Sequence, residues 1–73
     1  MQARSTAQIL KIIGCKHLEL VKVNGSGYWY FKFDDGHSYE TESVYTPKLS
    51  DMTVLQWVEV GAAFVKECVH RYE

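Results

Sequence analysis

Three runs of strand-forming residues, joined by very short connections, constrain the fold of this chain more than any other feature. The runs cover residues 18–23, 28–33 and 37–45. The first connection contains Asn-Gly-Ser-Gly and the second contains Asp-Asp-Gly, and both are typical of hairpin turns. Connections this short force neighbouring strands to run antiparallel, so the sequence predicts a three-stranded antiparallel meander.

A short helix is predicted before the first strand. Ser5 and Gln8 have capping-box spacing, in which the two side chains satisfy free amides at a helix start. Apolar residues follow at positions 9, 10, 12 and 13, and Gly14 is suited to a left-handed residue that ends the helix. Residues 1–4 carry no such pattern and are expected to be disordered.

A longer helix is predicted over residues 54–70. Thr53 and Gln56 repeat the capping-box spacing, and Met52 and Trp57 have the spacing of a hydrophobic staple. The residues predicted to lie at the centre of its apolar face recur at spacings of three and four. They are Leu55, Val58, Ala62, Val65 and Val69. A second set flanks and widens that stripe, namely Trp57, Gly61, Phe64 and Cys68.

The fold class that follows is α+β, in the order α-β-β-β-α, with the two helices packed on one face of the sheet. The chain has 73 residues, which is room for one domain, residues 1–73, and no second core. Apolar residues make up 47% of it, enough to fill a core without disulfides or a metal.

Strand register can also be predicted for both hairpins. A four-residue loop in the first hairpin pairs Leu20 with Phe31. In the second, a two-residue turn would set Phe31 opposite Glu40 and place a carboxylate among core aromatics. A three-residue loop instead pairs Phe31 with Tyr39, and this register is favoured.

These registers sort the strand residues onto two faces. The predicted core face consists of Leu18, Leu20, Trp29, Phe31, Phe33 and Tyr39. The predicted outer face consists of Glu19, Val21, Val23, Tyr28, Tyr30, Lys32, Glu40 and Glu42.

The outer face supplies the candidate site, because no helix is expected to cover it. The predicted interaction residues are Val21, Val23, Tyr28, Tyr30 and Lys32. A contiguous apolar strip rimmed by charge often marks an interface, and tyrosine is favoured there. The expected partner is a protein, either a second copy in a homodimer or another protein. The alternatives are a solvated face of β-forming residues, or helices divided between both faces.

Metal and catalytic sites are not predicted. Cys15, His17, Cys68 and His70 form two C-x-H pairs. Cys68 and His70 are predicted on a helix, where residues two apart point about 200° apart, so these two cannot face one metal. The cysteines are expected to be free thiols, with a Cys15–Cys68 disulfide as the alternative.

The tip of the second hairpin is the remaining cluster with acid–base chemistry. Asp34, Asp35 and His37 gather there, but Asp-Asp-Gly is also what such a turn requires, and no pocket is expected around it. The glycine-rich segment 24–27 joins two strands and is therefore a turn rather than a phosphate loop. The chain is therefore predicted to be neither an enzyme nor a cofactor-binding protein.

Charge argues against nucleic acid and membrane partners. The net charge is −1, so no strong overall field attracts nucleic acid or acidic membranes. Residues 1–4 lack the apolar region of a secretion signal, and no run reaches the ~18 apolar residues of a membrane span. A cytoplasmic protein is therefore expected. The helix–strand order resembles the double-stranded RNA-binding domain, but residues 53–59 lack the lysine or arginine that family uses.

Single-stranded nucleic acid is the alternative partner. Tyr28, Tyr30 and Lys32 alternate along one strand as stacking platforms do, although Glu19 and the predicted outer-face residues Glu40 and Glu42 would repel phosphate.

Several aromatic segments also resemble a group of short proteins encoded by bacteriophages, prophages and plasmids. The segments are residues 27–31 (Gly-Tyr-Trp-Tyr-Phe) and 43–45 (Ser-Val-Tyr), then Leu49, Thr53 and residues 57–59 (Trp-Val-Glu). The group has no assigned activity, so no functional residue can be transferred from it. The resemblance implies a bacterial cytoplasm and an accessory role, such as modulating a host or phage protein. The chain departs from the group's pattern at residues 45–47, which predicts an early end to the third strand.

Overall fold

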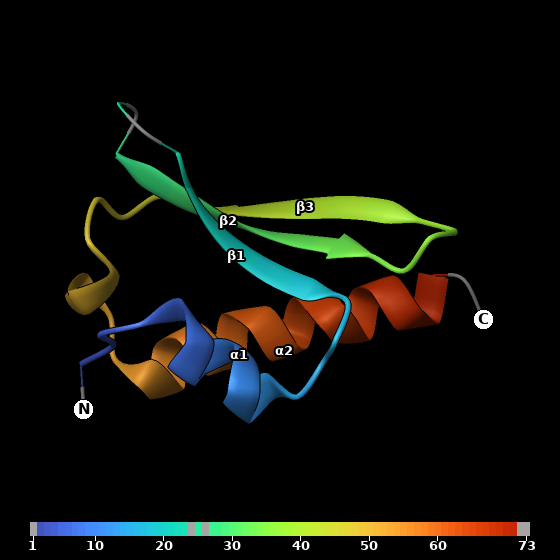
Figure 1. Ribbon diagram of the computed structural model, residues 1–73, viewed down its shortest axis with the longest axis horizontal. Helices are drawn as coiled ribbons and strands as arrows, with labels where there is room; N and C mark the ends of the chain where they lie inside the picture. Colours follow the sequence, from blue (N-terminus) through green and yellow to red (C-terminus); the bar gives the residue numbers. More distant parts are fainter. Residues whose placement is uncertain (1, 24, 26, 72–73) are drawn as a thin grey trace.

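A single antiparallel sheet forms one layer of the protein, and two helices form the other (Figure 1). The computed structural model describes residues 2–23, 25 and 27–71. Its elements are α1 (Thr6–Ile13), β1 (Leu18–Val23), β2 (Tyr28–Asp34), β3 (Tyr39–Val44), the short 3₁₀ helix η1 (Leu49–Asp51) and α2 (Val54–Arg71). The strand order β1-β2-β3 and the position of both helices on one face confirm the predicted α+β meander.

Both helix starts form as their local sequences predict. The Ser5 side chain accepts a hydrogen bond from the Gln8 N–H at 3.2 Å, and α1 ends at Gly14 in the left-handed conformation, with φ of 76°. At α2, the Gln56 side chain accepts from the Thr53 N–H at 2.9 Å, and the Thr53 hydroxyl accepts from the Gln56 N–H at 3.1 Å. This reciprocal pair is a capping box.

The residues before α1 are held more firmly than expected. The Ala3 side chain is fully buried, and its N–H donates to the carbonyl oxygen of Met52 at 3.1 Å. Gln2 forms an isolated antiparallel bridge with Thr53. The start of the chain is therefore tied to the start of α2, and among residues 1–4 only Met1 lies outside the described residues.

The first hairpin has the predicted register. Leu18 lies opposite Phe33, Leu20 opposite Phe31 and Val23 opposite Tyr28. The second hairpin does not, because its loop has four residues rather than three, and Asp34 lies opposite Tyr39.

The side chain of Asp35 holds this longer loop closed. It accepts hydrogen bonds from the backbone N–H groups of His37 and Ser38, each at 2.9 Å, and from the Ser38 hydroxyl at 3.2 Å. Three bonds to one carboxylate stabilise a turn that residue spacing alone did not predict.

The altered register exchanges residues of β3 between the two faces. Glu40 and Glu42 lie opposite Phe33 and Phe31, so they are on the helix side, and Tyr39, predicted in the core, is 60% exposed on the other side. The helix side tolerates the carboxylates because α2 packs against β2, which leaves β3 as an edge with access to water. Carboxylates on an edge strand also discourage pairing with another chain.

The core lies between the inner sheet face and the helices. Within residues 54–69 of α2 the buried residues are Val54, Trp57, Gly61, Phe64 and Cys68. The prediction that Leu55 and Val69 are central to its buried face is wrong, since they are 66% and 44% exposed. Both stripes have the same spacing, and the sheet packs the one that contains Trp57 and Phe64, whose large rings bury the most apolar area.

Candidate interaction face

The side of the sheet away from the helices carries the predicted site, and neither helix covers it (Figure 1). Alternation along the three strands, together with Tyr45 just beyond β3, defines what we call the tyrosine face: Val21, Val23, Tyr28, Tyr30, Lys32, Tyr39 and Tyr45. All five predicted interaction residues are on it. Four of the five tyrosines of the chain gather there, and two of them, Tyr39 and Tyr45, were not predicted to belong to it.

The side chains of this face cover one another. Val21, Val23, Tyr28 and Tyr30 are half-buried although no other element lies over them. The Tyr45 ring packs on that of Tyr28, with centroids 5.4 Å apart. Tyr45 itself is 83% exposed, so the most accessible aromatic surface lies at the end of β3 and beside the first hairpin.

An ion pair borders the apolar strip. Lys32 Nζ lies 3.2 Å from Glu19 Oε2, on the facing residue of β1. The hydrogen bond and the charge of Glu19 raise the pKa of Lys32, with smaller contributions from Tyr39 and Tyr30. Lys32 therefore has a carboxylate neighbour on this face. The other lysine of these strands, Lys22, lies on the opposite face above Trp29.

The electrostatics of the face differ from the prediction because two of its expected carboxylates are missing. Glu40 and Glu42 lie on the helix side, as described above, and Thr41 and Ser43 occupy the corresponding outer positions. The face therefore has a neutral aromatic and aliphatic centre, with Glu19 and Lys32 paired beside it.

The acidic hairpin tip serves the turn. Asp34 accepts a hydrogen bond from the Gly36 N–H at 3.0 Å, and Asp35 holds His37 and Ser38 as described. The hydrogen bonds that Asp35 accepts lower its pKa, and the one from the His37 backbone N–H contributes most. Both carboxylates are engaged with backbone amides, which is a structural role.

The cysteine and histidine side chains that the structure describes do not form a cluster. Cys15 is half-buried, Cys68 is buried, and neither forms a disulfide. His17 packs edge-on against Phe33, with ring centroids 6.1 Å apart, and the side chain of His70 lies outside the described residues. Among the described side chains, which do not include that of His70, no group of three or more metal-ligating residues is present.

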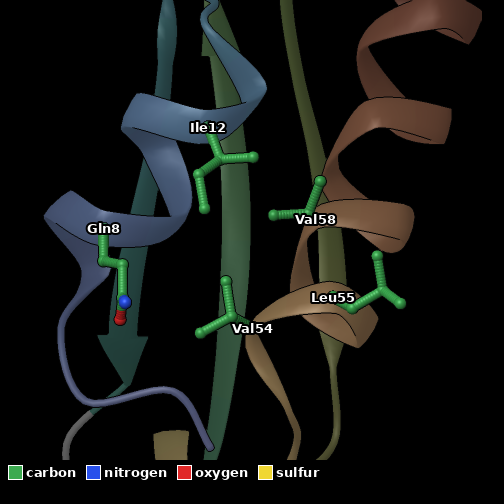
Figure 2. A pocket seen from close by; sticks show the side chains of 5 residues that line it. All are labelled: Gln8, Ile12, Val54, Leu55 and Val58. Atoms are coloured by element: carbon green, nitrogen blue, oxygen red, sulfur yellow. The ribbon is translucent and has the colours of Figure 1, made fainter. Parts of the chain in front are cut away.

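A second apolar surface, a groove between the helices, was missed by the sequence analysis. Its volume is about 320 Å³, and Figure 2 shows Ile12 and Val58 reaching toward each other from α1 and α2. The lining residues are Gln8, Ile12, Val54, Leu55 and Val58. The strands lie behind both helices in this view, so the groove opens away from the sheet. The exposed apolar residues of the helices could have indicated it only once the core-facing stripe of α2 was known.

Comparisons with known proteins add no family or relative to this description of an α+β protein. No protein-family model matches the chain, and neither a curated protein nor a solved structure matches it. In the described part of the chain, neither helix combines the length and apolar character needed to cross a bilayer.

Proposed function

We propose that this protein is a non-enzymatic protein–protein interaction module that binds its partner on the tyrosine face. The observation that carries the proposal is the gathering of Tyr28, Tyr30, Tyr39 and Tyr45 with two valines on a sheet face that neither helix covers. Tyrosine offers a large contact area at low entropic cost, and contiguous apolar strips of this kind mark interfaces.

The size of the face indicates a transient contact. Three strands about 5 Å apart, with six residues of about 3.4 Å each, give a flat area of a few hundred Å². Stable interfaces bury about 800 Å² on each partner, so this face alone supports a weak complex, or one in which the partner also reaches the edge of β3. The resemblance to short phage- and plasmid-encoded proteins supports a cytoplasmic bacterial or phage protein as the partner.

The test combines a cross-linking residue on the tyrosine face with substitutions of Tyr30. A photo-cross-linking residue at the exposed outer position Thr41 is expected to capture one protein from bacterial extract. Tyr30→Glu should abolish that product while leaving the circular dichroism spectrum unchanged, and Tyr30→Phe should retain it. Capture that persists in Tyr30→Glu would show that the face is not the binding surface. A product containing only this chain would identify the face as a self-interface.

Single-stranded nucleic acid is the second candidate, favoured by one observation. The register of β3 removes Glu40 and Glu42 from the face, so two of the three carboxylates expected to repel phosphate lie elsewhere. Stacking on Tyr28 and Tyr30 remains available, although Lys32 is already paired with Glu19. A labelled single-stranded oligonucleotide should then bind with salt-sensitive affinity, and no binding at low ionic strength would exclude this function.

A further inference from the structure

Helix α2 carries a second apolar stripe, of which only Val58 and Val65 pack against the core. Its members are Leu55, Val58, Ala62, Val65 and Val69. Their spacing alternates between three and four residues, which is the a/d pattern of a coiled-coil seam two heptads long. Leu55, Ala62 and Val69 are exposed, and Val58 and Val65 are half-buried. We call these five residues the α2 seam.

The groove between the helices continues the α2 seam at its N-terminal end. Leu55 and Val58 belong to both surfaces, and Ile12 of α1 adds an apolar side chain that is 57% exposed. In Figure 2 Leu55 points away from Ile12 and Val58, which leaves the space between α1 and α2 open. Seam and groove therefore adjoin along α2, about 100° around the helix from the stripe that faces the core.

The charges beside the α2 seam are complementary to those of a second copy. Glu59 and Lys66 each follow a seam valine by one residue and lie seven residues apart, on the solvent side of the seam. Within the part of the chain that the structure describes, neither takes part in an ion pair. In an antiparallel pair of helices these positions face each other, so Glu59 of each copy meets Lys66 of the other.

A parallel arrangement lacks this match. In parallel coiled coils the Glu59 and Lys66 positions face those on the far side of the partner's seam, which here are Gly61 and Cys68. The charge pattern therefore selects the antiparallel orientation.

We propose that two copies of this chain dimerise through their α2 seams, packed antiparallel about a two-fold axis. In the register that the seam favours, Ala62 lies opposite Val65 of the second copy, and Val58 lies opposite Val69. Val69 of the second copy then projects into the groove beside Ile12, which explains why that groove is open and apolar. Glu59 and Lys66 of the two copies are offset by only about 3 Å along the axis, within reach of their side chains.

This dimer leaves both tyrosine faces free. The tyrosine face is the side of the sheet away from both helices, so contact between α2 helices leaves it uncovered in each copy. A bivalent protein of this kind would hold a partner with two binding sites more tightly than one weak face could. The dimer itself does not depend on the proposed function of the tyrosine face.

The experiment measures solution molar mass by sedimentation equilibrium over a wide concentration range. Wild type is expected to pass from monomer to dimer as concentration rises. Glu59→Lys turns two attractive pairs into two repulsive ones and should weaken the dimer roughly thirtyfold. Lys66→Glu should have a similar effect, and the double exchange Glu59→Lys/Lys66→Glu should restore the dimer to within about threefold of wild type.

Two further variants separate this surface from the tyrosine face. Ala62→Arg, at an exposed site in the middle of the seam, should leave a folded monomer, whereas Tyr30→Glu should dimerise as wild type does. A wild type that stays monomeric at every concentration would overturn the proposal. So would a dimer that survives Ala62→Arg, is lost in Tyr30→Glu, or is not restored by the charge exchange.

Discussion

Replacing Gly61 by alanine sets two opposing effects of known size against each other. Within a helix, alanine is favoured over glycine by about 1 kcal/mol, so propensity alone predicts a more stable protein. A Cβ atom at this position, however, would lie 2.5 Å from Ile13 Cδ1 and 2.9 Å from two carbon atoms of the Phe31 ring. The methyl group does not fit without movement of both neighbours.

The Phe31 ring decides the balance. Ile13 Cδ1 is the end of a flexible side chain, but Phe31 is fully buried and its ring meets that of Trp57 edge-on, with centroids 6.1 Å apart. Overpacking a filled core costs about 1–3 kcal/mol. With about 1 kcal/mol regained from propensity, Gly61→Ala should destabilise the protein by about 1 kcal/mol.

Urea unfolding followed by tryptophan fluorescence measures this change in the free energy of unfolding. The matched control is Ala63→Gly at an exposed site of the same helix, which should lose about 1 kcal/mol from propensity alone. Ile13→Val removes the Cδ1 atom, so the cost of Gly61→Ala should be smaller in that background than in wild type. A Gly61→Ala protein about 1 kcal/mol more stable than wild type would refute the close packing of α2 on the sheet.

Two other predictions concern the core and the second hairpin. The Trp57 indole N–H donates to the Leu49 carbonyl at 2.8 Å, whereas the buried Trp29 indole N–H has no partner among the described residues. Trp57→Phe should therefore cost about 1 kcal/mol more in free energy of unfolding than Trp29→Phe, and an equal cost in chemical denaturation would contradict that hydrogen bond. The pKa of Asp35 is lowered in the folded protein, so folding favours its ionised form. Its contribution to stability is present above the unfolded pKa of about 3.9 and is lost as pH falls through the lower folded pKa. Asp35→Asn should flatten the acid side of the stability–pH profile measured by urea unfolding, and a profile parallel to wild type would show that the turn does not depend on the charge.

The candidate site was partly predictable because it rests on the first hairpin. The alternation of Val21, Val23, Tyr28, Tyr30 and Lys32 places these residues on one face once the loop length is known, and that loop was predicted correctly. The contribution of β3 was not predictable in the same way. Its register depends on the side-chain hydrogen bonds of Asp35, which make a four-residue loop as acceptable as a shorter one.

What the sequence by itself determined is the set of features that residues close in the chain decide together. These are the two helix caps at Ser5 and Thr53, the stop at Gly14, the order of the elements and the register of the first hairpin. Each depends on spacings of a few residues, where backbone geometry allows few solutions.

The tertiary structure alone decided which of two equivalent stripes of α2 faces the core, where Ala3 docks, and which face receives Tyr39. The two stripes differ by one residue along α2 and share a periodicity, so no local pattern ranks them. Packing ranks them, because burying Trp57 and Phe64 against the sheet removes more apolar surface from water than burying Leu55 and Val69. In the other stripe Leu55, Ala62 and Val69 are left exposed, and they belong to the surface proposed for dimerisation.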